Sequence, residues 1–382
     1  MKIILSLIGR IVGSTGGVEK VACNMANALA DRGHDVTILA FENKEGIPFF
    51  PLKDDVKFLN LGIGFEFNHT LFNLKHIFMN RAVKEKERLL FDCNQIAERV
   101  QEDIKLISPD IVVTFEKRSD VLFKKYIKGI TPPIITMFHF DYKSILKNKS
   151  MHDIYEQSDC IQVLTKNDLI NTKKIIKKPL VVLINNAVPQ FSESSQLEHK
   201  CIINVARVEP NQKRQHLLIE AFSKIKDKYP DWKVKIYGEV NFDKKYYEKC
   251  CRLISNYGLE KQIEFFGKTN DIKAKLLDSS IFAFPSSFEG FPLALTEAMA
   301  IGLPVIGYAS CSGTNEVIKD GETGFLCEDG VEPFAEALDK LMGDKELRIK
   351  MGKSAKESMK EYAPEKIWNQ WEELIEKVIR EQ

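Results

Sequence analysis

The order of segments in the first forty residues restricts the chain to few folds. Lys2–Ile8 is an apolar run of strand length, and the glycine-rich Gly9–Gly17 follows it. Val18–Arg32 repeats apolar residues at helical spacing, Gly33 ends this helix, and Val36–Phe41 is a second apolar strand. Two strands joined by a helix run parallel, and parallel sheets are covered by helices on both faces. The chain is therefore predicted to begin with a β-α-β unit of an α/β fold.

The same alternation continues through the chain and restarts after a polar linker, Pro189–Lys200. Leu71–Ile107 lacks helix breakers and is predicted as one or two long helices. Buried strands are predicted at Ile111–Phe115, Ile134–Phe138, Cys160–Leu164, Val181–Ile184, Cys201–Ala206, Val234–Tyr237, Ile263–Phe266, Ile281–Pro285 and Pro304–Gly307. Helices are predicted at His216–Lys228, Lys245–Asn256, Ile272–Leu277, Pro292–Ala300 and Pro364–Arg380. We therefore predict two doubly wound sheets in series, with ligands at the carboxyl ends of their strands.

The composition argues against several classes of function. The 55 Lys and Arg residues balance 54 Asp and Glu, so no excess of positive charge points to a nucleic-acid partner. The eight cysteines include no C-x-x-C pair, which argues against a zinc site or a disulfide framework and fits reduced thiols in the cytoplasm. The longest weakly charged stretch, Gly290–Asn315, contains Glu297 and is interrupted by prolines and glycines, so no membrane span is predicted.

The glycine-rich turn after the first strand suits either an anion or close packing. Gly13–Gly17 lies where backbone N–H groups and the helix dipole favour negative charge. Its spacing is neither that of the dinucleotide motif G-x-G-x-x-G nor that of a P-loop. Tight packing of strand against helix explains the turn as well as a ligand does, so these residues alone leave both explanations open.

Two cations follow the first strand of the second half. Arg207 and Lys213 lie after Cys201–Ala206, where an Arg fork and a Lys point charge can clamp a diphosphate. The alternative is a solvated turn in which these cations pair with Glu209. On spacing alone, the solvated turn is the better explanation.

Two carboxylates flank the start of a predicted helix whose first residue is Pro292. Glu289 lies in the loop before this helix and Glu297 lies within it, and ionised carboxylates accept hydrogen bonds from vicinal hydroxyls. Both can also be ordinary surface acids. Glu297 has apolar neighbours, however, and an unpaired carboxylate among them is costly, which favours a function (Leu295, Ala298 and Met299).

The run Phe284–Ile306 (FPSSFEGFPLALTEAMAIGLPVI) resembles the signature of glycosyltransferase family 4, whose members are retaining enzymes with the GT-B fold. Gly16–Glu19, Arg207 with Lys213, and Asn315–Leu326 resemble the family pattern as well. The resemblance covers nearly the whole chain. It implies two Rossmann-like doubly wound domains facing across a cleft, an acceptor-side domain at 1–188 completed by the C-terminal helix 365–382, and a nucleotide-sugar domain at 189–364.

The resemblance also implies roles for individual positions. Arg207 and Lys213 would neutralise the donor diphosphate, Glu297 would hold the ribose hydroxyls, and Glu289 would hydrogen-bond the donor sugar. Backbone N–H groups would cradle sugar and phosphate over Gly290, Phe291, Pro292 and Leu293. Further implied contacts are Gly16 and Gly17 with the diphosphate, His139 with the sugar, and Gly267 and Lys268 with the nucleobase.

Some matched positions carry a second explanation or depart from the family. A lone histidine beside Phe138 is otherwise typical of a structural role for His139, and Asp141 is a further candidate for orienting the acceptor. Glu239 stands where many members have a glycine, and Gly313–Asn315 stands where many have Gly-Pro. These departures leave the base and the donor sugar open.

The implied activity is transfer of a hexose or N-acetylhexosamine from a nucleotide-sugar, with UDP as the default, to a lipid-linked or lipopolysaccharide-type glycan. No metal and no cofactor are expected, and no nucleophile is assigned. The alternatives are a soluble transferase with a small-molecule acceptor and a non-catalytic subunit that binds nucleotide-sugars. A Rossmann oxidoreductase is disfavoured because Glu42 follows glycines of the wrong spacing.

A basic and aromatic stretch in the first half bears on the acceptor. Five apolar residues, from Leu71 to Phe78, alternate with five cations from Lys75 to Arg88. A basic amphipathic helix can lie on an anionic membrane surface, which would place a cytoplasmic enzyme at the inner face of the membrane. The alternative is a core-facing helix with a solvated charged back, and the residues alone do not separate the two.

Overall fold

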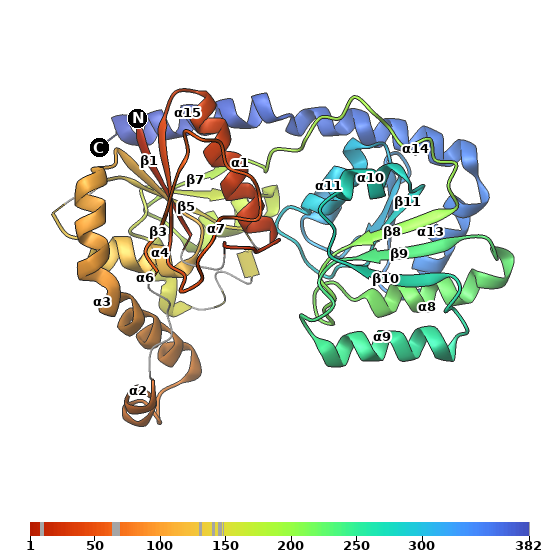
Figure 1. Cartoon of the computed structure of the whole chain (residues 1–382), viewed down its shortest axis with the longest axis horizontal. Coiled ribbons are helices and arrows are strands. Elements are labelled where there is room, and N and C mark those ends of the chain that lie inside the picture. Colours follow the sequence, from red (N-terminus) through yellow and green to blue (C-terminus); the bar gives the residue numbers. More distant parts are fainter. Residues whose placement is uncertain are drawn as a thin grey trace. The chain divides into compact units, whose positions relative to one another are not determined.

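A computed structural model describes residues 1–7, 11–62, 69–129, 132–139, 142–143, 147 and 149–381. The chain divides into two compact units (Figure 1). Unit 1 consists of Met1–Asn186 and Ile367–Gln382, and unit 2 of Ala187–Lys366. The predicted boundaries, after residues 188 and 364, lie close to these divisions.

Unit 1 is built on a parallel sheet, which has seven strands within the described residues, in the order β3-β2-β1-β4-β5-β6-β7. The strands are β1 (Lys2–Leu7), β2 (Asp35–Ala40), β3 (Lys57–Asn60), β4 (Ile111–Thr114), β5 (Ile134–Met137), β6 (Cys160–Val163) and β7 (Leu180–Leu183). Its helices are α1 (Gly17–Asp31), α2 (Thr70–Lys75), α3 (Arg81–Ile107), α4 (Lys117–Val121), α6 (His152–Tyr155), α7 (Lys166–Ile175) and α15 (Pro364–Arg380), of which residues from Ile367 onward belong to this unit. A π-helical turn, Leu122–Tyr126, and a 3₁₀ turn, Lys149–Met151, complete it.

Unit 2 has a six-stranded parallel sheet in the order β10-β9-β8-β11-β12-β13. The strands are β8 (Cys201–Val205), β9 (Lys233–Tyr237), β10 (Ile263–Gly267), β11 (Ile281–Phe284), β12 (Val305–Tyr308) and β13 (Gly324–Cys327). The helices are α8 (Gln215–Ile225), α9 (Lys244–Asn256), α10 (Ile272–Leu277), α11 (Leu293–Ala300), α12 (Thr314–Val317), α13 (Val331–Gly343) and α14 (Lys345–Ser358), with 3₁₀ turns at Lys226–Lys228 and Met359–Tyr362.

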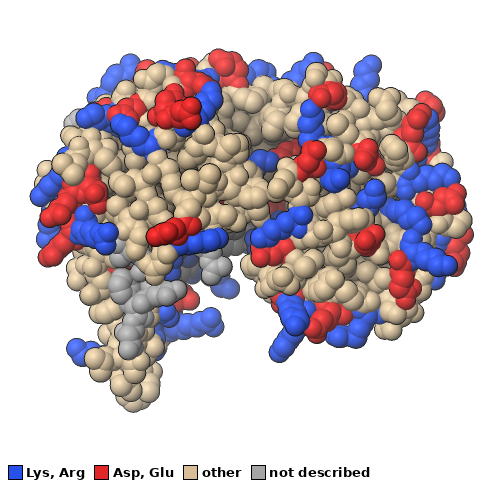
Figure 2. Space-filling view, viewed as in Figure 1, with Lys and Arg blue, Asp and Glu red and all other residues tan. Residues whose placement is uncertain are grey.

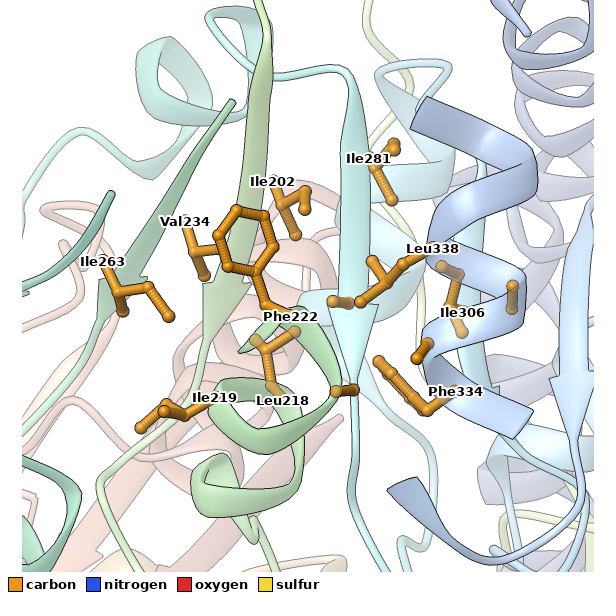
Figure 3. Packing of buried hydrophobic residues seen from close by; sticks show 14 of the residues in the cluster. Ile202, Leu218, Ile219, Phe222, Val234, Ile263, Ile281, Ile306, Phe334 and Leu338 are labelled. Carbon is orange, nitrogen blue, oxygen red and sulfur yellow. The ribbon is translucent and has the colours of Figure 1, made fainter. Parts of the chain in front are cut away.

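The core of unit 2 lies between one face of this sheet and helices α8 and α13 (Figure 3). Phe222 from α8 and Leu338 from α13 point toward the strand residues Ile202 and Ile281, and all four are fully buried. Strands covered on both faces need apolar residues at nearly every position, which is why β8 and β11 could be predicted as short continuous apolar runs.

The C-terminal helix α15 packs on unit 1 through a buried apolar face and through polar contacts of Glu372. Trp368, Trp371 and Ile375 are buried. Glu372 accepts from His34 Nε2 at 3.0 Å and lies 3.6 Å from Arg32 Nε. The last helix of the chain is therefore part of the first unit.

The structure adds elements that the sequence pattern did not predict. Strands β3 and β13 are short strands at the sheet edges, and each has partly exposed residues at its centre. Helix α14 is rich in Lys and Glu, so its apolar stripe is weak. Pro292, predicted as the first helical residue, instead lies at the N-cap position of α11. Among the described residues, no helix combines the length and the apolarity that crossing a bilayer requires.

Candidate active site

The strand order of unit 2 creates a switch point between β8 and β11. The chain leaves β8 for β9 on one side, and β11 later pairs with the other side of β8. The loops after these two strands therefore diverge, and ligands of doubly wound folds bind where that happens. Arg207 and Lys213 follow β8, and Glu289 follows β11, so three predicted site residues lie at this point.

A largely buried ion pair joins the two loops. Lys213 Nζ lies 2.6 Å from Glu289 Oε1, and the two side chains are 14% and 10% exposed. The ammonium also lies 5.2 Å from the centre of the Phe284 ring. Lys213 is therefore a desolvated cation fixed by its ion pair. The prediction of a solvated turn, which spacing alone favoured, is wrong for this residue.

Gln212 connects this pair to Arg207, and the sequence analysis missed it. Its Oε1 accepts from Arg207 Nη2 at 2.7 Å, and its Nε2 donates to the Phe288 carbonyl at 3.0 Å and lies 3.4 Å from Glu289 Oε2. Arg207 also lies over the Phe242 ring at 4.8 Å. One buried amide therefore positions both a cation and a carboxylate.

Glu209, which was predicted only as a partner for the cations, organises their loop instead. Its carboxylate accepts from the backbone N–H groups of Asn211 and Gln212 at 2.8 Å each. Arg214, also missed, donates to the carbonyls of Pro285 and Ser286 at 3.0 Å each and so ties the loop after β8 to the loop after β11. The role of Arg214 could not be predicted from the sequence because it depends on a contact between distant loops, whereas Glu209 acts on residues two and three positions along its own loop.

Two glycines allow close backbone approach around the site. A Cβ on Gly313, whose φ is +75°, would lie 2.4 Å from the Gly290 carbonyl oxygen. A Cβ on Gly238, whose φ is +143°, would lie 2.0 Å from the carbonyl oxygen of Ala206, the residue before Arg207. Side chains at either position would push the site loops apart.

Helix α11 starts beside Glu289 and has no side-chain hydrogen bond at its N-cap. Of the four positions from Gly290 to Leu293, Pro292 has no N–H and cannot donate, which corrects its predicted part in the cradle. Phe291 is buried and packs edge-on against Tyr362 at 5.2 Å, so its side chain belongs to the core of unit 2. Glu297 is 7% exposed on this short helix.

Gly267 and Lys268 lie at the end of β10, two strands from the switch point. The Gly267 carbonyl accepts from the N–H of Gly238 at 2.9 Å, which links this strand end to the Arg207 loop. Lys268 Nζ pairs with Glu239 at 3.2 Å, with both side chains more than 40% exposed. Glu239, which stands where many family members have a glycine, thus forms an ion pair near the position predicted to border the nucleobase.

Gly16 and Gly17 belong to unit 1, at the start of α1. Glu19 lies over Gly16: its Oε2 is 2.1 Å from where a Cβ on Gly16 would be, and its Oε1 accepts from Ser14 Oγ at 2.9 Å. A diphosphate at Gly16 would face this carboxylate. Glu42 accepts from the backbone N–H groups of Ile11 and Val12, so it holds the same turn.

His139 also belongs to unit 1, just after β5. Its ring stacks on Phe115 at 5.1 Å with an interplanar angle of 15°. Burial lowers the pKa of His139 to about 3, so the ring is neutral near pH 7. Asp141 lies outside the described residues.

Within the part of the chain that the structure describes, no group of three or more His, Cys, Asp or Glu side chains is arranged to hold a metal ion. Seven of the eight cysteines are buried.

Two family models match adjacent parts of the chain. "Glycosyltransferase Family 4" matches residues 15–188, and "Glycosyl transferases group 1" matches residues 189–358. Together they cover most of both units.

Several named proteins are similar in sequence. An "Uncharacterized glycosyltransferase" of Haemophilus influenzae is 26% identical, over 95% of this chain and 97% of its own. The "N-acetyl-alpha-D-glucosaminyl L-malate synthase" of Bacillus anthracis is also 26% identical, over 96% of each chain. A Campylobacter jejuni N-acetylgalactosaminyltransferase, named for a diphospho-undecaprenol-linked acceptor, is 23% identical over 96% of each chain.

Solved structures share the fold. The sucrose-phosphate synthase of Thermosynechococcus elongatus superposes with a TM-score of 0.79 at 16% identity, over the whole of both chains. Anabaena HepE, in complex with UDP and glucose, gives a TM-score of 0.74 at 17% identity, over 99% of this chain and 100% of its own. Glycosyltransferase family models match both halves of the chain, and solved structures with the GT-B fold superpose on both of its parallel-sheet units. The protein therefore belongs to the family 4 type of GT-B glycosyltransferases.

Proposed function

We propose that this glycosyltransferase takes a hexose or N-acetylhexosamine from a UDP-sugar and transfers it with retention of anomeric configuration. The observation that carries the proposal is the buried Lys213–Glu289 pair at the β8–β11 switch point, linked through Gln212 to Arg207. This cluster joins two cations that suit a diphosphate to a carboxylate that suits sugar hydroxyls. The choice of UDP is supported by the complex of HepE with UDP and glucose.

The proposed chemistry is electrostatic. Cleavage of the donor bond places negative charge on the departing diphosphate and positive charge on the anomeric carbon. Arg207 and Lys213 neutralise the diphosphate, while N–H groups at the start of α11 add partial positive charge. Glu289 orients the donor sugar and Glu297 holds the ribose. The two cations supply the charge that the leaving group needs, so the proposed chemistry requires no metal ion and no cofactor.

For the acceptor, we propose a lipid-linked or lipopolysaccharide-type glycan at an anionic membrane surface. The undecaprenol-linked acceptor in the name of the Campylobacter jejuni relative supports this class. The name of the Bacillus anthracis relative, a malate synthase of similar identity, supports a second candidate, transfer to a small soluble acceptor. The surface of unit 1 favours the lipid-linked or lipopolysaccharide-type acceptor.

That surface has an apolar tip, which we define as residues 69–84. Its exposed large apolar side chains are Leu71 (78%), Leu74 (63%), Ile77 (64%), Phe78 (100%), Met79 (41%) and Val83 (41%). The same sixteen positions include three cations, Lys75, Arg81 and Lys84, and no acid. In Figure 2 the lower-left part of the molecule, where Figure 1 labels α2, is largely tan with blue side chains beside it.

The tip differs from the basic amphipathic helix that the sequence suggested. Helix α3 buries its apolar stripe in the core of unit 1, including Cys93, Ile96 and Val100, and so follows the core-facing alternative. The exposed apolar residues instead gather on α2 and the turn after it. Contiguous apolar surface beside cations suits insertion into an anionic bilayer.

The donor assignment is tested by thermal shift with UDP, GDP, ADP, UDP-sugars and NAD, on the wild type and Lys213→Ala side by side. A ligand at a hundred times its dissociation constant adds about 2.7 kcal/mol of stability. We expect a UDP-selective shift that Lys213→Ala and Glu297→Ala weaken. A shift with NAD alone, or equal UDP shifts in all variants, would contradict the assignment of Lys213 and Glu297 to the donor site.

The membrane surface is tested by co-sedimentation with vesicles of phosphatidylglycerol and phosphatidylcholine. We expect binding to anionic vesicles that falls with salt and is lost in the double variant Ile77→Ser, Phe78→Ser. Ile47→Ser is the matched control, because Ile47 is 78% exposed outside the tip. Binding that is unchanged in the double variant, or transfer that is insensitive to vesicles, would favour the small soluble acceptor.

A further inference from the structure

Arg214 has a backbone conformation that residues with a side chain rarely adopt. Its φ is +49°, in the left-handed region, and among the described residues other than glycine only Ser108 and Leu197 also have a positive φ. A Cβ in this region lies close to the following carbonyl oxygen, so the conformation is strained for most residues. Non-glycine residues held at such angles gather at functional sites, where surrounding contacts keep them in place. The strain at Arg214 therefore calls for compensating contacts.

The Arg214 side chain makes those contacts with the far side of the site. Nε donates to the Pro285 carbonyl and Nη2 to the Ser286 carbonyl, both at 3.0 Å. The guanidinium carbon lies 4.9 Å from the centre of the Tyr308 ring, and Nη2 lies 4.0 Å from Asp329. Pro285 and Ser286 are both buried, so their carbonyls would lose these two hydrogen bonds with little water to replace them. The guanidinium is thus committed to protein contacts.

The strained backbone angle lies directly after Lys213. Arg214 is the N-cap residue of α8: its N–H donates to the Glu209 carbonyl at 3.0 Å, and its carbonyl accepts from the Leu217 N–H at 2.9 Å. Its φ is the rotation that joins the peptide group of Lys213 to the start of this helix. The left-handed turn therefore sets the direction in which the loop carrying Lys213 leaves α8.

The loop after β8 and the loop after β11 are bonded residue by residue. Beyond the contacts of Arg214, the Ser287 N–H donates to the Gln212 carbonyl at 2.8 Å, and Ser287 Oγ donates to the Asn211 carbonyl at 2.7 Å. Together with the contacts of Gln212 and Lys213 described above, every residue from 285 to 289 is held by a residue from 211 to 214. Arg214 holds the end of this series that is nearest to β11. A change at Arg214 therefore acts on the loop that carries Glu289.

We propose that Arg214 is a positioning residue for the donor site. Its left-handed turn aims the loop of Lys213, and its two bonds to the loop after β11 hold Glu289 opposite, so that both ends of the 2.6 Å ion pair depend on one residue. Arg214 acts through this pair and does not itself bind the donor. The inference rests on the proposed function, in which Lys213 neutralises the donor diphosphate.

The test compares two substitutions of Arg214 in the full chain, by calorimetric titration with UDP and by thermal denaturation. Arg214→Ala keeps the strained φ and removes the side-chain contacts, so we expect a lower melting temperature and a UDP affinity at least tenfold weaker. Arg214→Gly removes the same contacts but relieves the strain. It should therefore melt above Arg214→Ala and still bind UDP as weakly. UDP affinity that follows the melting temperature, or that is unchanged in both variants, would overturn the inference.

Ser108→Gly is the matched control for strain. Ser108 has nearly the same φ, +48°, at the exposed C-terminal end of α3 in unit 1. This substitution should raise the melting temperature of unit 1 and leave UDP affinity unchanged within twofold. A tenfold change in UDP affinity would show that relief of strain alone alters binding, which would overturn the interpretation of the Arg214 variants.

A double-mutant cycle with Lys213→Ala separates positioning from direct contact with the donor. If Arg214 acts through Lys213, adding Arg214→Ala to Lys213→Ala should weaken UDP binding by no more than about threefold. Losses that multiply in full would mean that Arg214 acts on the donor independently, against the inference. Wild type that fails to bind UDP would instead overturn the proposed function, so the two failures are distinguishable.

Discussion

Lys213 and Glu289 are 76 positions apart, yet their side chains form the most buried ion pair found at the ends of the unit 2 strands within the described residues. Each charge compensates the desolvation of the other, and Gln212 holds the Glu289 side of the pair. Arg207 is less enclosed, resting on a half-exposed Phe242. A diphosphate would thus meet one fixed cation and one adaptable cation.

Removing Glu289 is expected to have two separable effects. Glu289→Ala leaves the Lys213 ammonium buried without its carboxylate, which should destabilise unit 2 by about 3 kcal/mol. It should also lower turnover more than it lowers nucleotide affinity. Urea denaturation and steady-state kinetics measure the two effects.

The matched control is Glu357→Ala, which removes the carboxylate of an exposed pair with Lys360, 2.7 Å apart. It should change stability by less than about 0.5 kcal/mol. Equal costs for the two variants would show that burial of the Lys213–Glu289 pair does not matter.

His216 predicts a pH dependence of stability. Burial, with Lys249 and Arg214 nearby, lowers the pKa of His216 from 6.5 to about 4, and Nδ1 lies 2.8 Å from the Tyr246 hydroxyl. Between these pH values the unfolded chain binds a proton that the folded chain does not, so stability is lost as pH falls from 6.5 towards 4. Denaturation at pH 7 and pH 5 should show a smaller loss for His216→Gln than for wild type. Identical losses would contradict the assignment.

At the scale of elements, the site depends on two loops that must approach closely. The loop after β12 reaches the loop after β11, where the Glu289 N–H donates to the Ser312 carbonyl at 3.0 Å. Gly313 makes this approach possible because it combines a positive φ with no side chain. The Gly-Pro pattern of the family is absent here, but the glycine that the geometry needs is present.

Gly313→Ala should therefore lower the free energy of unfolding by more than backbone strain alone would lower it. Gly321 offers the comparison, because its φ is +72° and nothing lies within 4 Å of a Cβ built there. Gly321→Ala should cost about 1 kcal/mol, the price of a left-handed conformation. Gly313→Ala should cost at least twice as much and also weaken UDP binding. Equal costs in thermal denaturation, with UDP binding intact, would show that the contact with Gly290 is not limiting.

Strands that are buried on both faces were predicted well, because their residues are apolar at nearly every position. Strands β1, β8 and β11 are covered on both faces and so read as continuous apolar runs. Edge strands β3 and β13 are only partly buried, and short apolar patches of that kind are common in loops. The exposed tip at α2 has the composition of a core helix, so its exposure could not be predicted from periodicity.

At the scale of the whole molecule, the chain builds one unit from both of its ends. Residues from Ile367 onward pack on unit 1, with Trp371 among its largest buried side chains. The stability of unit 1 therefore depends on residues translated after unit 2 is complete. Sequence order alone would assign this helix to the second half, whereas the family resemblance implied that it completes the first domain.

Trp371→Ala should destabilise unit 1 by about 3–5 kcal/mol, because it removes a fully buried aromatic side chain. Calorimetry should show one unfolding transition lowered and the other unchanged. Phe222→Ala in unit 2 is the matched control and should lower the other transition. If both substitutions lowered the same single transition, the two units would not unfold independently.

Local sequence patterns were enough to predict the α/β class, the two serial parallel sheets and the glycosyltransferase signature, and they supplied the candidates Arg207, Lys213, Glu289 and Glu297. These follow from local periodicity and short motifs, which register burial and turn chemistry within a few residues. The tertiary structure decided which candidates meet. It joined Lys213 to Glu289 through Gln212, set Glu209 under their loop, placed Glu19 over Gly16, and stacked His139 on Phe115. Strand order, rather than distance along the chain, fixes which strand ends are neighbours, and only those neighbours can share a proton, a charge or a ligand.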